Sequence, residues 1–215
     1  VILLERGDAP GSKNVTGGRI YVGPVRKYLP EIMDSAPFER HVVKEMVTVL
    51  DDTSALSCEY TNKKWRQGPY MSYTVLRARF DSWFADQAAA KGAFIIPKKK
   101  VESLLWEDGK VAGIKSGPEE IGAHVVIAAD GALSFMAEQA GMRGPHKPQN
   151  LAVAVKEIYQ LDEKVIEYRF GLENDEGAAG LYMGSVTQGM FGGGFLYTNR
   201  DTLSVGLVLG IHQLA

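Results

Sequence analysis

Short runs of apolar residues, separated by turn-forming residues, predict a chain made mainly of strands with few helices. Val1–Leu4 is an unbroken apolar run that stops at Glu5 and Arg6, a pattern typical of a buried strand in a parallel sheet. Residues 94–96 show the same pattern. The stretch 7–18 is rich in Gly, Pro, Ser and Asn, and we expect it to form a long loop.

Helical periodicity is clearest over residues 76–91. Apolar side chains recur there at helical spacing and predict one apolar stripe, at Leu76, Phe80, Trp83 and Phe84. Gly92 follows as an expected C-terminal cap. Shorter helices are predicted over 26–34 and 133–140.

Several further runs are predicted to be strands. They cover 42–50, 56–60, 98–106, 111–115 and 121–129. The runs 42–50 and 56–60 are expected to pair. Asp108-Gly109 lies between the runs 98–106 and 111–115, and an Asp-Gly pair between two such runs predicts a hairpin. The fifth run ends at Asp130-Gly131.

The pattern changes near residues 144–149. Glycine-broken β-rich runs follow and predict an antiparallel meander, at 151–161, 180–186, 190–198 and 203–211. Asp162 opens a helical turn between the first two of them. We therefore expect a mixed α/β (or α+β) chain of two domains, residues 1–145 and residues 146–215.

The composition is that of an ordinary globular protein. Of 215 residues, 45% are hydrophobic and 23% charged, and a net charge of -2 gives no basic field that would attract nucleic acid. No apolar run approaches the roughly 20 residues that span a bilayer. Cys58 is the single cysteine, and we expect a reducing compartment and a buried or half-buried side chain that packs as a small hydrophobe rather than acting as a redox thiol. The four histidines show no metal-ligand spacing.

Both ends of the sequence lie within β-rich runs. The chain begins inside an apolar run at Val1, and neither a helix nor a cap follows the last β-rich run before Ala215. We therefore expect a piece of a longer protein, whose open sheet edges favour self-association.

Glu5 is the first candidate for cofactor binding. In dinucleotide-binding folds an acidic residue at the end of a strand accepts hydrogen bonds from ribose hydroxyls, and a carboxylate offers two acceptor oxygens. The alternative is a solvated charge that closes the strand. The Gly-x-Gly-x-x-Gly turn expected roughly 20 residues earlier is absent, and the triplet at 192–194 lies between two β-rich runs, so it opens no helix.

Two further positions are candidates for contact with phosphate. Asp130-Gly131 follows a predicted strand, where glycine permits a ligand to approach backbone N–H groups; the alternative is an ordinary turn. Arg77 opens the helix at 76–91, and its planar guanidinium suits phosphate. The alternative is a surface arginine paired with Asp81 at i+4.

These features occur together and in order, and the segments that carry them resemble a known family. The segments are Val-Ile-Leu-Leu-Glu-Arg-Gly from Val1, Ser-Lys-Asn-Val-Thr-Gly-Gly-Arg from Ser12, Ser-Tyr-Thr-Val-Leu-Arg-Ala-Arg-Phe-Asp from Ser72, Ala-Ala-Asp-Gly-Ala-Leu-Ser from Ala128 and Gly-Gly-Gly-Phe-Leu-Tyr from Gly192. They resemble the FAD-dependent electron-transfer flavoprotein–quinone oxidoreductases, most closely the FixC branch, over essentially the whole chain. The Asp-Gly segment is shared with aromatic hydroxylases and geranylgeranyl reductases.

The resemblance implies a partial FAD-binding, Rossmann-like domain followed by an antiparallel-sheet domain on the substrate or quinone side. It also implies site roles: Glu5 with Arg6 at the adenosine ribose, Val101 at the adenine edge, Arg77 and Asp130-Gly131 near the pyrophosphate and ribityl chain, and Thr16, Gly17 and Gly18 beside the isoalloxazine ring. No catalytic side chain and no metal ligand is implied.

The resemblance further implies electron transfer from an electron-transfer flavoprotein to a quinone or to a ferredoxin-like iron–sulfur partner. The expected location is cytoplasmic, with peripheral contact at the inner face of the membrane as a further possibility. The alternatives are an FAD-dependent monooxygenase or geranylgeranyl-reductase-like enzyme, and a folded but inactive piece without cofactor. We expect the 215 residues alone to bind FAD weakly or not at all.

Overall fold

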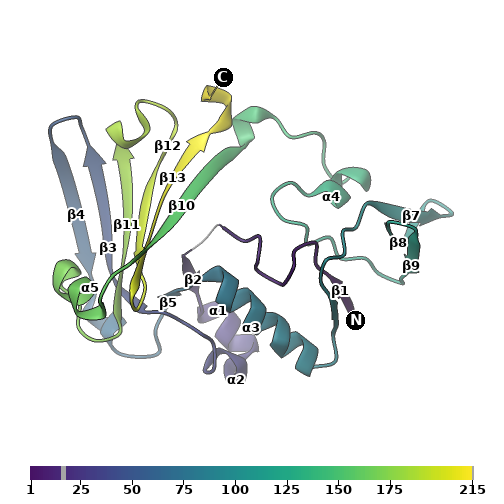
Figure 1. Ribbon diagram of the computed structural model, residues 1–215, viewed down its shortest axis with the longest axis horizontal. Helices are drawn as coiled ribbons and strands as arrows, with labels where there is room; N and C mark the ends of the chain where they lie inside the picture. The colour runs from purple at the N-terminus through teal and green to yellow at the C-terminus, as the bar shows by residue number, and fades with distance from the viewer. Residues whose placement is uncertain (16–17, 215) are drawn as a thin grey trace.

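A curled eight-stranded sheet forms one side of the molecule (Figure 1). The computed structural model describes residues 1–15 and 18–214, without the side chains of Ile32 and Lys63. The strand order is β10-β13-β12-β11-β3-β5-β2, and β4 pairs with β3. The strands are β2 (Arg19–Tyr21), β3 (His41–Leu50), β4 (Ala55–Thr61), β5 (Ser72–Thr74), β10 (Ala152–Gln160), β11 (Glu176–Gly184), β12 (Gly192–Thr198) and β13 (Thr202–Gly210).

The predicted meander is confirmed, since β11, β12, β13 and β10 are joined by antiparallel pairing. The triplet at 192–194 begins β12 and opens no helix, as expected. β3 lies parallel to β11, so the sheet takes strands from both sides of the domain boundary expected at residue 146. That boundary stays a prediction, and the hydrogen bonding of the sheet crosses it.

A second, smaller unit holds the Rossmann-like elements. β1 (Ile2–Leu4) pairs in parallel with β6 (Phe94–Ile96), and α3 (Arg77–Ala90) lies between them in the sequence. The prediction that both strands are buried is wrong: Ile2 is 53% exposed and Phe94 is 69% exposed. The physical reason is that β1 and β6 form a sheet of only two strands in the described part of the chain, so their other edges and faces stay open.

A three-stranded meander follows, formed by β7 (Ser103–Glu107), β8 (Lys110–Ser116) and β9 (Glu119–Gly122). Asp108 and Gly109 have φ angles of 49° and 73°, typical of a type I′ turn, and the hairpin expected there is confirmed. The strand predicted over 121–129 is wrong beyond Gly122. The N–H of Ala123 still donates to the Ala112 carbonyl of β8, but no described strand pairs with residues 124–130. Ile127 is 85% exposed, so its apolar character alone does not make a strand.

The helices are short except for α3. They are α1 (Gly23–Tyr28), α2 (Pro30–Met33), α4 (Phe135–Gln139) and α5 (Glu163–Phe170), with 3-10 turns at Lys63–Arg66, Pro148–Asn150, Ser185–Thr187 and Ile211–Gln213. The helix expected over 26–34 is two helices, because Pro30 interrupts it. α3 is confirmed, and Gly92 beyond its end has a φ of 93°. Phe80 is buried there, whereas Phe84 is 41% exposed, so the predicted stripe is only partly covered.

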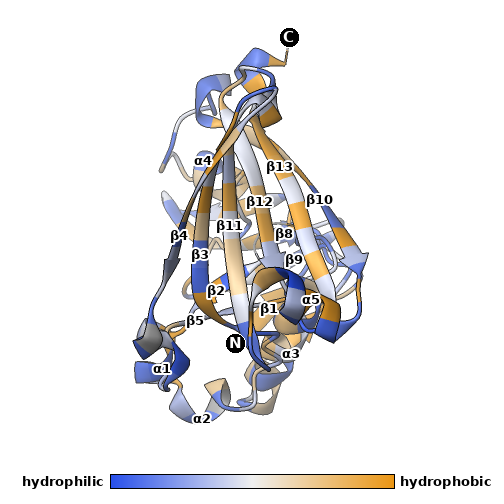
Figure 2. Cartoon of the chain, turned by 90° about the vertical axis from the view of Figure 1, so that its left-hand side faces the viewer, coloured by the Kyte–Doolittle hydropathy of each residue, from blue (hydrophilic) through white to orange (hydrophobic). Residues whose placement is uncertain are grey.

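The two faces of the large sheet contact different parts of the chain. We call inner the face that lies toward α3 and the loop 7–15. On it Glu45 forms an ion pair with Arg19 at 2.6 Å, and the Tyr197 ring packs against Gly18. Its outer face carries Lys44, whose Nζ donates to the Phe170 carbonyl at 2.7 Å. α5 lies over one end of the outer face, and hydrophobic residues line the strands above it (Figure 2).

Candidate functional site

The candidate site lies where the loop 7–15, the first turn of α3 and the inner face of the sheet meet. Gly11 lies so close to α3 that a Cβ there would come within 2.8 Å of the Asp81 Cβ. Nδ2 of Asn14 donates to Oδ2 of Asp81 at 2.6 Å. At the other end, the N–H of Val75 donates to the Gly18 carbonyl at 3.0 Å. The loop is therefore held against both α3 and the sheet.

Glu5 lies at the end of β1, where its side chain is held by its own loop. Its N–H donates to the Ile96 carbonyl at 3.0 Å, and its Oε1 accepts from the N–H of Gly7. Gly7 is buried, and a Cβ there would lie 2.4 Å from Oγ of Ser12. The Gly7 contact uses only Oε1, so the half-buried carboxylate has a second oxygen of the kind that a ribose hydroxyl needs.

Val101 and Asp130 are brought to the same side of the molecule as Glu5. The N–H of Lys99 donates to the Glu5 carbonyl at 2.8 Å, and Leu4 and Val101 both pack against a core that includes Met136. Asp130 Oδ2 accepts from the N–H of Met136 at 2.9 Å.

Gly131, next to Asp130, has a φ of 78°. Its carbonyl accepts from the N–H and the hydroxyl of Ser134, at 3.1 and 2.7 Å. Asp130 and Gly131 are both exposed. The backbone therefore forms a turn at Asp130-Gly131, as the alternative interpretation expected. The role of these residues in binding phosphate stays a prediction.

Arg77 forms the ion pair with Asp81 that the sequence offered as the alternative to a phosphate contact. Its Nε and Nη2 donate to the two carboxylate oxygens of Asp81, at 2.8 and 3.0 Å. This bidentate contact fixes the plane of the guanidinium. Nη1 takes no part in it, so the pairing orients Arg77 without using all of its donors.

Gly18 packs directly on the inner face. A Cβ at Gly18 would lie 2.2 Å from Cδ2 of Tyr197, so the close approach of loop and ring requires glycine. Burial raises the pKa of the Tyr197 hydroxyl. Thr16 and Gly17, the other two residues predicted beside the flavin ring, lie outside the described residues.

The remaining predicted residues contribute less to this site. Arg6 is exposed, and its predicted role at the adenosine ribose stays a prediction. Cys58 was expected to be buried or half-buried, and this is wrong: it lies exposed on β4, which among the described strands pairs with β3 alone. Within residues 1–15 and 18–214, no three His, Cys, Asp or Glu side chains gather as a metal site, and no helix is long and apolar enough to cross a bilayer.

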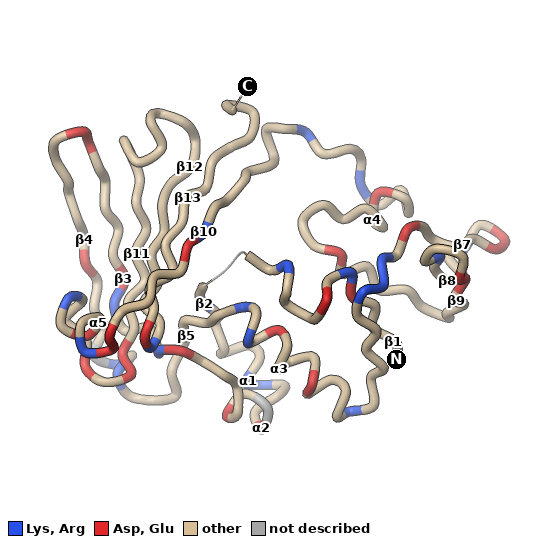
Figure 3. Tube along the Cα trace, viewed as in Figure 1, with Lys and Arg blue, Asp and Glu red and all other residues tan. Residues whose placement is uncertain are grey.

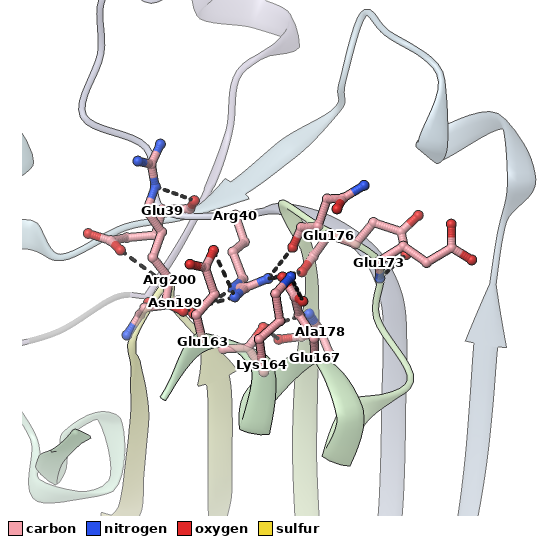
Figure 4. Close-up of polar contacts among 12 residues, drawn as sticks. Glu39, Arg40, Glu163, Lys164, Glu167, Glu173, Glu176, Ala178, Asn199 and Arg200 are labelled. Carbon is pink, nitrogen blue, oxygen red and sulfur yellow. Dashed lines mark hydrogen bonds and ion pairs between the residues drawn. The ribbon is translucent and has the colours of Figure 1, made fainter. Parts of the chain in front are cut away.

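Arg40, which sequence reasoning missed, joins four segments at one end of the sheet (Figure 4). It is 1% exposed. Its guanidinium donates to the carbonyls of Asn199 at 2.7 Å, Arg200 at 2.8 Å and Glu176 at 3.1 Å. Glu167 of α5 lies 3.5 Å from Nη1. The signal in the sequence was a polar triplet, 39–41, directly before a β-rich run.

An apolar hollow of about 520 Å³ lies on the outer face of the sheet. Val155, Tyr182, Leu196 and Leu207 are among the side chains that line it. None of the predicted cofactor residues lines this hollow, and the sheet separates it from the loop 7–15. The candidate site is therefore the junction on the inner face.

Comparisons with known proteins agree in sequence and in fold. No family model matches the chain. Protein FixC of Escherichia coli (strain K12) is 45% identical over 214 residues, and the probable electron transfer flavoprotein-quinone oxidoreductase YdiS of the same strain is 41% identical over 215 residues. Each match covers 100% of this chain and 50% of the relative, so the chain spans about half the length of the curated relatives it matches.

Solved structures share the fold at lower identity. A geranylgeranyl bacteriochlorophyll reductase-like protein from Thermoplasma acidophilum has a TM-score of 0.74 at 23% identity, over 98% of this chain and 50% of that one. CtdE in complex with FAD has a TM-score of 0.65 at 18% identity, over 100% of this chain and 54% of that one. These likenesses show the fold alone. The chain is therefore similar in sequence, along its whole length, to FixC and YdiS, and it shares its fold with these solved structures.

Proposed function

We propose that the natural protein that contains this chain is an FAD-dependent oxidoreductase, and that the chain forms one wall of its FAD site. The observation that carries the proposal is the junction of the loop 7–15, α3 and the inner face. There Glu5 begins the loop, Asn14 ties the loop to Asp81 and so to Arg77, and Gly18 beyond the loop meets the inner face. A dinucleotide along the loop would have its ribose at Glu5, its diphosphate at Arg77 and its ring at Gly18. FixC and YdiS, the sequence relatives, support the same proposal.

The residues present fit such a ligand. Glu5 presents a carboxylate whose Oε1 is already fixed by Gly7, and Arg77 presents a guanidinium oriented by Asp81. Gly18 leaves the backbone without a side chain where it meets the inner face. FAD, when bound, would supply the electron-carrying chemistry. The chain itself would bind the ribose, orient the diphosphate and exclude water from the ring.

We propose an electron-transfer flavoprotein as the donor and a quinone as the acceptor. The inner face would suit the flat, apolar ring of a quinone, because it exposes apolar side chains: Ile158 is 50% exposed and Leu181 is 53% exposed, near the half-buried Tyr197. The printed name of YdiS, a probable electron transfer flavoprotein-quinone oxidoreductase, supports the assignment. A ferredoxin-like iron–sulfur protein is the second acceptor that we propose, with the protein in the cytoplasm at the inner face of the membrane.

A geranylgeranyl-reductase-like or monooxygenase activity is the second candidate function. The likeness to the reductase-like protein of Thermoplasma acidophilum, at a TM-score of 0.74, favours it as a fold-level argument only. The two functions differ in their reductant. Oxidation of NADH or NADPH that depends on an added isoprenoid or aromatic substrate would support the second candidate and contradict the first.

The test uses the natural full-length protein that contains this chain. We expect it to carry one FAD per chain, visible as the absorption band of oxidised flavin. The band should bleach when reduced electron-transfer flavoprotein is added without oxygen, and it should return when a soluble quinone is added. A Glu5→Gln variant should bind FAD more weakly, whereas the matched change Glu120→Gln in the exposed strand β9 should have no effect. A preparation free of flavin, or one that donor protein does not bleach, would contradict the proposal.

A further inference from the structure

The apolar hollow on the outer face of the large sheet follows from the glycines of its middle strands. Pairing puts Val155, Leu207, Gly194 and Tyr182 in one row across β10, β13, β12 and β11. Gly194 leaves a gap in that row, because it has no side chain between Leu207 and Tyr182. A Cβ at Gly180 would lie 3.1 Å from Cε2 of Tyr182, so the Tyr182 ring leans along β11 toward Gly180 and does not fill the gap.

The outer face is covered at one end. Of the described α-helices, α5 is the one that lies on this face, and Phe170 and Leu172 at its end pack into a core with Ala178 (Figure 2). Ala178 is 0% exposed there. Farther along the sheet, where no described helix lies, Leu207 is 39% exposed and Val155 is 65% exposed. The cover that α5 provides therefore stops short of the hollow.

The hollow is apolar at its centre and polar at its margins. β12 and β13 carry no charged residue along their length (Figure 3). On the β10 side, the Tyr159 hydroxyl donates to Oε2 of Glu157, and both residues line the hollow. Toward β4, the hydroxyls of Thr48 and Ser57 are 2.9 Å apart. An apolar centre within a polar rim is the usual arrangement of an interface between protein segments.

The dimensions of the hollow favour one helix as its cover. Side chains of β10, β13, β12 and β11 line it, and strands about 4.8 Å apart make it roughly 14 Å wide. A helix with its side chains is about 10–12 Å across, and a sheet with two apolar faces needs a layer on each. A second copy of the chain suits the hollow less, because two concave faces would enclose a void, which protein interiors rarely contain.

The curated relatives indicate where such a helix comes from. FixC and YdiS match this chain over 50% of their own length, so a natural protein of their size has about as many residues outside this chain as within it. We propose that one helix from those residues packs in the hollow, with its apolar side chains against Leu196, Val205 and Leu207. The inference concerns the outer face alone, and it does not depend on which cofactor or substrate the protein takes.

A photoreactive residue in the hollow identifies the occupant directly. Leu207→p-benzoylphenylalanine, in the natural full-length protein that contains this chain, places a photoreactive ring there. After irradiation and proteolysis, mass spectrometry identifies the peptide that is joined to position 207. We expect a peptide from outside residues 1–215, in a product that runs as a monomer in denaturing electrophoresis. Lys110→p-benzoylphenylalanine, at an exposed site in the β7–β8 hairpin, is the matched control and should give no such product.

Hydroxyl-radical oxidation of the unaltered full-length protein is the second measurement. Tyr159 lines the hollow and is 51% exposed, whereas Tyr168 on α5 is 90% exposed, so an open hollow would let the two rings react at rates within about twofold of each other. Under a helix, we expect Tyr159 to react at least about tenfold more slowly than Tyr168, because the centre of an interface excludes water.

The outcomes separate the possible occupants. Cross-linked dimers would assign the hollow to a second copy and overturn the proposal. The absence of any peptide joined to position 207 would overturn it too, in favour of open solvent or a small apolar ligand. Equal cross-linking from Leu207 and Lys110, or similar oxidation of Tyr159 and Tyr168, would likewise contradict a helix packed in the hollow.

Discussion

Replacement of Arg40 by methionine tests how the sheet is held together at the end beside α5. The side chain is 1% exposed, and it donates to the carbonyls of Asn174, Glu176, Asn199 and Arg200, at distances between 2.5 and 3.1 Å. Methionine has a similar reach and no donor. The change therefore removes the hydrogen bonds of four carbonyls while it leaves the volume nearly filled.

The expected loss of unfolding free energy follows from the Glu167 carboxylate, which loses its Arg40 partner. Glu167, whose side chain is 9% exposed, lies 3.5 Å from the guanidinium. Without Arg40 it would keep its charge, with Lys164 at 2.7 Å as its one close cation among the described side chains. Removal of one partner of a buried ion pair costs roughly 3–5 kcal/mol of unfolding free energy. For a chain of this length we expect the melting temperature to fall by roughly 6–20 °C.

Urea unfolding, followed by circular dichroism, measures this free energy. Arg169→Met is the matched control, because Arg169 is exposed in the last turn of α5, and we expect its effect to stay within about 0.5 kcal/mol. Glu163→Gln removes the more distant and half-exposed partner, 3.7 Å from Arg40, and should cost less than about 1 kcal/mol. If Arg40→Met costs no more than Arg169→Met, Arg40 is not the link between these segments, and the reasoning fails.

Four further predictions follow from the same structure. Gly18→Ala should lower the unfolding free energy by about 1–3 kcal/mol, because its Cβ would meet the Tyr197 ring, and Tyr197→Ala in the same chain should recover part of the loss in urea unfolding. His41 has its pKa lowered by burial, so the unfolded chain binds the proton more readily, and stability should fall as the pH drops through the ordinary pKa of 6.5; His41→Gln should flatten urea-unfolding free energies between about pH 7 and pH 5, and an unaltered slope would contradict this. Cys58 should react fully with a thiol reagent in the native protein, and slow reaction that needs denaturant would contradict its exposure. The open edges of β4 and β10 should make the 215-residue chain self-associate, which a single monomer peak in size-exclusion chromatography at all concentrations would refute.

Elements governed by neighbours in sequence could be predicted without the structure. The hairpin at Asp108-Gly109 depends on two residues that accept positive φ angles. α3 ends where Gly92 allows it to, and α5 begins where the Asp162 side chain accepts the N–H of Lys164 at 2.8 Å. These signals act within one turn of chain, so a single sequence carries them in full.

Burial and pairing were predicted less well, because they depend on distant segments. The apolar run at 121–129 has the composition of a strand, but a strand also needs a neighbour that donates and accepts its hydrogen bonds, and residues 124–130 have none among the described strands. Cys58 looks like a core residue by type, yet it lies on β4 at the margin of the sheet. Residue type indicates a preference, and only the surrounding chain decides whether it is met.

The candidate site divides in the same way. The sequence alone determined which residue types could meet a dinucleotide, such as Glu5 at a strand end and Arg77 at a helix start, because these roles follow from local position and side-chain chemistry. Only the tertiary structure decided that Glu45 meets Arg19 and Tyr197 meets Gly18 on the inner face, and that Arg40 joins four separate segments. The physical reason is register: a shift of one residue along β3 would turn Glu45 to the opposite face of the sheet, away from Arg19, and the pairing of β3 with the distant strand β11 sets that register.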